Sequence, residues 1–211
     1  MAKAVLALLA LMLLVGAGVV VATRQGPKPQ AQATGTAPRP ARTPVARGAP
    51  KPRLAVWRSG TLEAPLQDPA AASAGAGRAL LLGGLTQADT SSAGIELAST
   101  RGARAAGTLP GALHDAAATR LGRYAYLFGG GNGVGSLDAI LRIPLAGGAA
   151  QAVGRLPAPS SDQTAAAIGS TAYVVGGYTG THWLDTIVAW RPGRTAQVVA
   201  HLPAPVRYAA V

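Results

Sequence analysis

Cysteine is absent from this chain of 211 residues, and no acidic residue precedes Glu63. The missing cysteine excludes disulfides, thiolate nucleophiles, cysteine-ligated zinc and iron–sulfur clusters. Aromatic residues make up only 4% of the chain, whereas there are 28 glycines. So many small residues favour a fold in which backbones approach each other closely.

The formal net charge of +11 is concentrated in the N-terminal quarter of the chain. Residues 1–53 hold 8 of the 19 basic residues and none of the 8 acids, so the rest has 11 against 8 and is close to +3. A nucleic-acid-binding face would combine basic residues with stacking aromatics on a folded surface. We therefore expect no nucleic-acid partner and interpret the basic excess as a solvated segment.

Residues 4–22 form an apolar run of 19 residues without a charge. At about 1.5 Å per helical residue the run would span roughly 28 Å, close to the thickness of a bilayer core. It predicts that residues 1–23 are a signal anchor or transmembrane helix in contact with the lipid bilayer. The alternative is a signal peptide cleaved before Thr23, which would leave a secreted protein.

Residues 24–53 are rich in proline, alanine, threonine and basic residues and contain almost no large apolar side chain. Such a composition predicts a disordered, extended linker between the membrane and a folded domain. The basic residues that flank the apolar run are nearly balanced, so they do not decide its orientation. We expect residues 54–211 to lie outside the cytoplasm, because long downstream domains are translocated largely regardless of charge.

A repeat of about 47 residues runs through the remainder of the chain. Three sets of residues mark it: Leu62, Leu109, Leu156 and Leu202; Asp68, Asp115 and Asp162; and Gly83, Gly129 and Gly176, each followed by a second glycine at 84, 130 and 177. Successive leucines are 47, 47 and 46 residues apart, the aspartates 47 and 47, and the glycines 46 and 47. This spacing predicts tandem units over 62–108, 109–155, 156–201 and 202–211.

Each unit has the pattern of four short strands. In the third unit these are the alanine-rich run after Asp162, the run "TAYVV" before the glycine pair, the alternating run "LDTIVAW", and "TAQVVA". The second unit matches with "DAAAT", "YAYLF", "LDAILRI" and "AAQAVG". Four strands in about 47 residues predict one propeller blade, with the alanine-rich strand innermost and the glycine pair ending the second strand at positive φ.

A strand ended by Gly-Gly, followed by an apolar strand and by Trp190, resembles the Kelch repeat. The resemblance covers Leu62 to Val211. It implies a β-propeller of the Kelch type, the architecture that galactose-oxidase-like copper enzymes share. Their copper chemistry needs a cysteine-linked tyrosine, which this sequence cannot form. The sequence departs from the family pattern at the tryptophan position, where we place Ile143 in the second unit and Leu97 in the first.

The repeated aspartates are the candidate ligand-binding residues. We expect Asp68, Asp115 and Asp162 to lie at one mouth of the central channel, with Arg207 near the corresponding position of the fourth unit. Two interpretations remain open: the carboxylates accept hydrogen bonds from the backbone of adjoining turns, or they hold a cation or polar ligand. Arg207 could offset their charge, which favours a structural network.

The other polar residues offer weaker candidates. Asp138 and Asp185 follow the glycine-rich turns and are expected to cap them. His114, His182 and His201 occupy three different phases of the repeat, so we predict no metal site and no cofactor, and we expect each to be a surface or turn residue.

Together these observations predict an all-β protein: a Kelch-like β-propeller of three four-stranded blades and the start of a fourth, behind an anchor helix and a disordered linker. Three blades are too few to close a ring, so we expect a fragment of a longer propeller, or two copies that complete one ring. The function expected is that of a membrane-anchored, non-catalytic module that binds a protein or glycan. The alternative is an extracytoplasmic enzyme that acts on carbohydrate or a small polar ligand through the aspartates.

Overall fold

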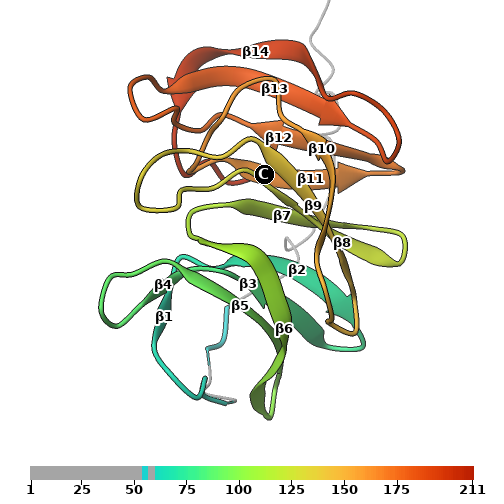
Figure 1. Cartoon of the computed structure of the whole chain (residues 1–211). Coiled ribbons are helices and arrows are strands. Elements are labelled where there is room, and N and C mark those ends of the chain that lie inside the picture. Colours follow the sequence, from blue (N-terminus) through green and yellow to red (C-terminus); the bar gives the residue numbers. More distant parts are fainter. Residues whose placement is uncertain (1–53, 57–59) are drawn as a thin grey trace, which may run out of the picture. The chain divides into compact units, whose positions relative to one another are not determined.

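The computed structural model describes residues 54–56 and 60–211, so the predicted membrane helix (1–23) and linker (24–53) lie outside it. The described residues form only strands, turns and loops. Three antiparallel sheets of four strands follow one another along the chain, and two further short strands pair separately (Figure 1). The all-β, propeller-like arrangement predicted from the repeat is thus observed. Within the described residues there is no helix long and apolar enough to span a bilayer.

Each four-stranded sheet is an antiparallel meander, interrupted in the first sheet by the short strand β4 between β3 and β5. The first sheet contains β2 (Ala70–Gly75), β3 (Arg78–Leu82), β5 (Ser92–Ser99) and β6 (Gly102–Leu113). The second contains β7 (Ala117–Leu121), β8 (Tyr124–Phe128), β9 (Ala139–Pro144) and β10 (Gln151–Arg155). The third contains β11 (Thr164–Ile168), β12 (Thr171–Val175), β13 (Leu184–Trp190) and β14 (Gln197–Val206). The short strands β1 (Leu66–Gln67) and β4 (Leu85–Thr86) pair with each other.

The strands expected in the second and third units are confirmed, but two fourth strands are longer than their sequence pattern. Strand β6 continues to Leu113 and β14 to Val206, so both include the Leu-Pro pair that begins the next sequence unit. The sheets therefore end later than the unit boundaries at 108 and 201. These two Leu-Pro pairs therefore belong to the outer strands β6 and β14, shortly before the chain leaves the sheet.

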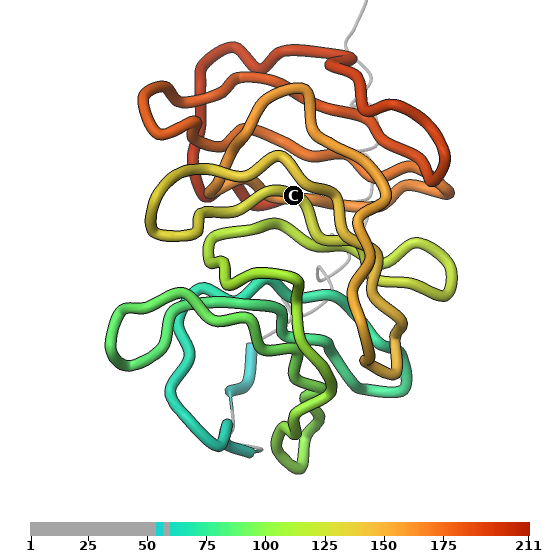
Figure 2. The backbone as a smooth tube through the Cα atoms, viewed as in Figure 1, coloured from blue at the N-terminus to red at the C-terminus, as the bar shows by residue number. Residues whose placement is uncertain are grey.

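The first strands of the three sheets, β2, β7 and β11, lie next to one another, and we call them the inner strands. The tube view shows the sheets stacked in chain order, from the first at the bottom to the third at the top (Figure 2). The alanine runs predicted for these strands occupy this position. Ala70, Ala72 and Ala74 are buried, and their small side chains leave room for the close approach of β7.

The core consists of two apolar layers, one on each face of the second sheet. Leu80 and Leu82 of the first sheet pack with Leu127 and Ile143 of the second. On the opposite face, Phe128 packs with Trp190 of the third sheet, with ring centroids 5.8 Å apart. Leu127 and Phe128 are consecutive residues of β8, and their side chains point to opposite faces as strand geometry requires. The second sheet is therefore buried on both sides.

Strand register corrects one residue of the repeat alignment. In the second and third sheets, Ile143 and Trp190 each lie opposite an alanine of the preceding strand. In the first sheet the residue opposite the corresponding alanine, Ala79, is Ala98. The prediction that Leu97 takes the tryptophan position is therefore wrong by one residue. A shift of one residue along a strand turns the side chain to the other face of the sheet.

The glycine pair at the end of each second strand packs closely against a backbone carbonyl group. Gly129 has φ +58, and a Cβ atom there would collide with the carbonyl oxygen of Ser160. The N–H of Gly130, at φ +105, donates to that same oxygen at 2.8 Å. The other two pairs make the same contacts, Gly83 and Gly84 with Leu113, and Gly176 and Gly177 with Val206. The positive φ predicted for the pairs is confirmed. The close packing is with the last strand of the same sheet or the loop that follows it, and not with a neighbouring blade as the repeat predicted.

The steric role of Gly129 can be separated from its positive φ. Gly122 has φ +59, but a Cβ atom added there would meet no other atom within 4 Å, so it is a matched control. We expect Gly122→Ala to lower the free energy of unfolding by about 1 kcal/mol through left-handed strain alone. Gly129→Ala should cost about 1–3 kcal/mol more, because the added methyl group is overpacked against backbone. Urea denaturation of both variants measures this difference, and equal losses would contradict the steric account.

Candidate functional site

A chain of backbone hydrogen bonds links the repeated aspartates. The N–H of Asp115 donates to the carbonyl of Asp68 at 3.4 Å, and that of Asp162 donates to the carbonyl of Asp115 at 2.8 Å. The N–H of Tyr208, at the same position of the next repeat, donates to the carbonyl of Asp162 at 2.8 Å. All four residues have φ between +49 and +58. Aspartate tolerates this left-handed conformation better than most residues, which gives one physical reason for its recurrence here.

Asp162 is the most deeply enclosed of the three carboxylates. The residue is 3% exposed, and its Oδ2 accepts hydrogen bonds from Arg207 Nη2 at 2.6 Å and from Ser161 Oγ at 3.3 Å. The Arg207 guanidinium also lies over the rings of Tyr178 and Tyr208, at 4.5 and 5.2 Å from their centroids. The charge-balancing role predicted for Arg207 is thus observed. A buried carboxylate needs such a partner, because desolvating an unpaired charge is costly.

Asp115 is joined to Asp162 by a backbone hydrogen bond, and its carboxyl group faces His114 Nε2 at 3.8 Å where Asp162 faces an arginine. Burial raises the pKa of the Asp115 carboxyl, and the nearby charges of Asp162 and Asp68 raise it further. One oxygen of Asp115 and one of Asp162, both named Oδ1, are buried and have no hydrogen-bond partner among the described residues. A proton on Asp115 would let this carboxyl group donate a hydrogen bond to Asp162, which is one of the causes that raise the pKa of Asp115.

The residue before each repeated aspartate also contributes to the cluster. Gln67 Nε2 donates to Asp68 at 3.0 Å, and His114 Nε2 lies 3.8 Å from Asp115 Oδ2. Ser161 bonds Asp162, while Arg207 at the same position of the next repeat bonds back to Asp162. The four preceding residues differ in type, so their residue types do not indicate that they share a role. The only signal in the sequence is their common position, one residue before each repeated aspartate or Tyr208.

His114 lies in the connection between β6 and β7 and is half-buried there. Its side chain is 19% exposed, and its Nδ1 makes a hydrogen bond of 2.8 Å with Ser91 Oγ. Tyr208 also belongs to the cluster, and burial together with Asp162 raises the pKa of its hydroxyl group.

The second pair of aspartates is also positioned differently from the prediction. Instead of capping turns, Asp138 accepts two hydrogen bonds from Arg155 Nη1, at 2.8 and 3.0 Å. Asp185 lies 3.0 Å from His201 Nδ1 on the neighbouring strand β14. Both pairs join the beginning of a third strand to the fourth. They are exposed, so each contributes little to stability.

The contacts of the aspartate cluster link neighbouring sheets. Its deepest carboxylate is neutralised by Arg207, and its backbone groups are used to join neighbouring sheets. The expected hydrogen bonds from turn N–H groups to the carboxylates are replaced by side-chain donors, while the backbone groups bond one another. Among the described residues, no group of three or more histidine, aspartate or glutamate side chains could hold a metal ion.

Comparisons with known proteins add nothing to these geometric observations. No model of a protein family matches the chain, and no curated protein matches it. What supports the Kelch resemblance is thus internal to the molecule: the spacing of the repeat, the glycine pairs and the order of the strands.

Replacing Asp162 or Asp115 by asparagine should have different effects on the free energy of unfolding. We expect Asp162→Asn to lower the free energy of unfolding at pH 7 by about 2 kcal/mol, because it removes a charged hydrogen bond with Arg207. Asp115→Asn should leave stability unchanged or raise it, because the amide is neutral and can donate to Asp162. Urea denaturation of both variants at pH 7 tests this. A loss above about 1 kcal/mol in Asp115→Asn would contradict a hydrogen bond donated from this position to Asp162.

The raised pKa of Asp115 also fixes the sign of a pH dependence. The folded state holds this proton more tightly than the unfolded state, whose reference pKa is 3.8. The contribution of Asp115 to stability is therefore fully present below that value and is lost as pH rises through the folded-state pKa. We expect the wild type to lose more stability than Asp115→Asn between about pH 3.5 and pH 7. Parallel stability profiles for the two proteins would contradict the assignment.

Proposed function

We propose that this protein is a non-catalytic binding module built from Kelch-like propeller blades and held at a membrane by residues 4–22. The observation that supports this best is the ion pair between Asp162 and Arg207, which closes the centre of the aspartate cluster. An enzyme that used these carboxylates would need an ionisable pair open to substrate. Here the carboxyl group with the least exposure is committed to a structural contact.

The Kelch-type assignment is supported by features that recur in all three sheets. Each second strand ends in a glycine pair whose second N–H donates to the carbonyl at the end of the same sheet or in the following loop. Trp190, the residue that best matches the family pattern, is 1% exposed and packs on Tyr126 and Phe128 of the preceding sheet. Propellers use the loops and faces of such blades for recognition, and fold alone does not specify a ligand.

The membrane part of the proposal rests on the sequence. The apolar run is long enough for a bilayer core, and the proline-rich residues 24–53 would separate the blades from the lipid surface. With the blades outside the cytoplasm, the ligand would be an extracytoplasmic protein or glycan.

Fractionation of cells that express the whole chain tests the anchor. We expect the protein to stay with membranes in alkaline carbonate and to be released by detergent, whereas a variant lacking residues 4–22 should not sediment with membranes. Protease added to intact spheroplasts should degrade the blades if they face outward. A shortened chain beginning at Thr23 in the soluble fraction would replace the anchor with a cleaved signal peptide.

Binding without turnover is tested with the detergent-solubilised whole chain. We expect retention on an array of glycans or peptides and no hydrolysis of chromogenic glycosides or esters. Asp68→Asn combined with Asp115→Asn should bind as the wild type does. Turnover that disappears in this double variant, while circular dichroism shows an intact fold, would contradict the proposal and identify the aspartates as catalytic.

A further inference from the structure

The connections of each sheet alternate between the two ends of its strands. In an antiparallel meander the turns after the first and third strands lie at one end, and the connections after the second and fourth strands lie at the other. The aspartate cluster and the glycine pairs belong to the second of these ends. Figure 2 shows the tips of the hairpins β2–β3, β7–β8 and β11–β12 on one side of the molecule. We call this the turn end, and it consists of the connections 76–77, 100–101, 122–123, 145–150, 169–170 and 191–196.

Charge is divided unevenly between these two ends. Six of the ten arginines in the described part of the chain lie in the connections of the turn end or within two residues of them: Arg78, Arg101, Arg120, Arg123, Arg191 and Arg194. Each sheet contributes two of the six, and all six are exposed. No acidic residue lies within the same distance of these connections. The turn end therefore carries positive charge alone.

Ion pairing also separates the turn end from the aspartate end. At the aspartate end, Arg155 and Arg207 each bond an aspartate. No carboxylate among the described residues forms an ion pair with an arginine of the turn end. Six like charges without carboxylate partners repel one another, and an external anion relieves this repulsion.

Two arginines from neighbouring sheets converge on one turn. Arg78 Nε donates to the carbonyl of Gly75 at 3.5 Å. Arg120 Nε donates to the carbonyl of Gly122 at 2.9 Å, and its Nη1 lies 3.0 Å from the position that a Cβ atom of Gly75 would take. The guanidinium groups of the first and second sheets thus lie on either side of Gly75. Both are oriented through Nε, which leaves their terminal nitrogens without an acceptor among the described residues.

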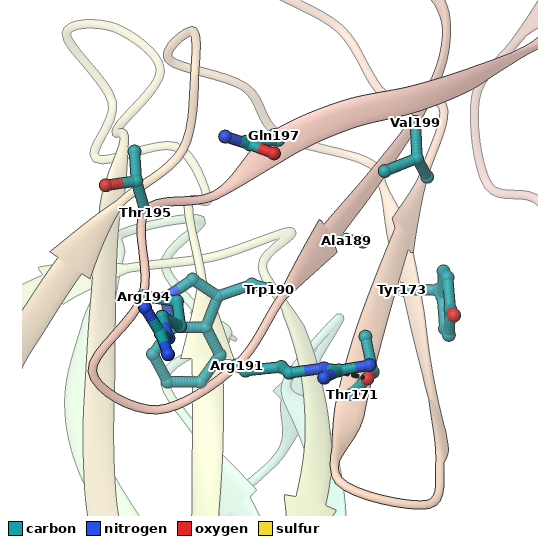
Figure 3. Close-up of a pocket in the computed structure, with 9 residues that line it drawn as sticks. All are labelled: Thr171, Tyr173, Ala189, Trp190, Arg191, Arg194, Thr195, Gln197 and Val199. Atoms are coloured by element: carbon teal, nitrogen blue, oxygen red, sulfur yellow. Dashed lines mark hydrogen bonds between the residues drawn. The ribbon is translucent and has the colours of Figure 1, made fainter.

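The third sheet repeats this arrangement. Arg191 Nε donates to Thr171 Oγ1 at 2.6 Å, and Arg194 follows in the same turn (Figure 3). One arginine of each sheet is therefore oriented through its Nε. The terminal nitrogens of a guanidinium are the groups that bind two phosphate oxygens side by side.

The turn end stays exposed even where sheets pack on both sides. The second sheet is covered by the first sheet on one face and by the third on the other. Arg120 and Arg123 are nevertheless exposed, because they lie at the ends of the strands and not on a sheet face. The positive surface is thus a property of each repeat and does not depend on a sheet before the first or after the third.

We propose that the turn end docks on the surface of an anionic phospholipid bilayer, with its arginines bound to lipid phosphate groups. Charge complementarity calls for an anionic partner, and the spread of the arginines over three sheets favours an extended surface over one small anion. None of the six connections contains an aromatic residue on which a nucleic-acid base could stack. This inference rests on the membrane part of the proposed function, because residues 4–22 would hold the blades near lipid. The linker 24–53 would reach up to roughly 90 Å when extended, so it allows this contact.

Fluorescence of the whole chain reconstituted in vesicles tests the proposal. Because the chain has no cysteine, Thr100→Cys places a single label at the turn end of the first sheet, and Ala88→Cys places one in the loop between β4 and β5 at the opposite end. The vesicles are phosphatidylcholine with or without about one third phosphatidylglycerol, and they carry a headgroup nitroxide as quencher. We expect phosphatidylglycerol to raise the quenching about twofold or more in Thr100→Cys and to leave Ala88→Cys unchanged.

Salt checks that the contact is electrostatic. In about 0.5 M salt the effect of phosphatidylglycerol should disappear, because surface charges are then screened within a few ångströms. An equal response of the two labels would show that the basic linker, and not the turn end, is attracted to the lipid. That result, or no response of Thr100→Cys, would overturn the proposal.

Matched charge variants identify the surface that docks. Arg123 and Arg155 are both exposed arginines of the second sheet, but they lie at opposite ends of it. With the label of Thr100→Cys, Arg123→Gln should weaken the effect of phosphatidylglycerol and Arg155→Gln should retain it. Arg78→Gln, Arg120→Gln and Arg123→Gln together should abolish it. Circular dichroism and thermal unfolding check that each variant is folded. Equal effects of Arg123→Gln and Arg155→Gln would overturn the assignment, because net charge alone would then account for the attraction.

Other anions give distinguishable results. A double-stranded oligonucleotide that binds the detergent-solubilised chain, and is weakened by Arg123→Gln while phosphatidylglycerol has no effect, would overturn the lipid partner in favour of nucleic acid. Inorganic phosphate that abolishes the quenching at constant ionic strength would indicate a site for the free ion and overturn lipid docking.

Failure of the anchor and failure of the docking are separable. A chain that does not enter the vesicles would contradict the membrane anchor, and the two labels are then compared with the same vesicles added to the chain in solution. A chain that enters the vesicles but shows no dependence on phosphatidylglycerol would overturn the docking and leave the anchor intact.

Discussion

The backbone hydrogen bond from Asp162 to Asp115, together with its counterparts one repeat before and one repeat after, is the constraint on which the structure depends. The bonds donated by Asp115 and Asp162 each join the loop before one inner strand to the loop before the next, and the bond donated by Tyr208 joins the residues after β14 to the loop before β11. All these residues have positive φ, at a cost that the short carboxylate side chains reduce at the three aspartates. Because the same bond recurs, the sheets follow one another with a similar offset, and their inner strands lie side by side.

The glycine pairs provide the second point at which backbone meets backbone. At Gly129 and Gly130 a strand end is held against the carbonyl of Ser160, at a separation that excludes a Cβ atom. Bonds between aspartates and contacts at glycine pairs therefore fix the inner strands and the second strands independently. The larger side chains, above all Trp190, then fill the space between sheets that these contacts define.

The links between sheets also accommodate charge. The backbone groups of the aspartate cluster join neighbouring sheets, and its most buried carboxylate is paired with Arg207. The carboxyl group of Asp115 lies in the same links, and burial together with the charges of Asp162 and Asp68 raises its pKa.

The sequence alone determined the repeat, the strands of the second and third units and the positive φ of the glycine pairs, because these follow from local patterns at fixed spacing. It indicated Arg207 as a partner for the aspartates but did not decide between a structural network and a ligand site. It did not determine the partners of Asp138 and Asp185, the half-buried position of His114, or the register that places Ala98 rather than Leu97 opposite Ala79. Those depend on which strands pair and in what register, and only the tertiary structure brings such residues together.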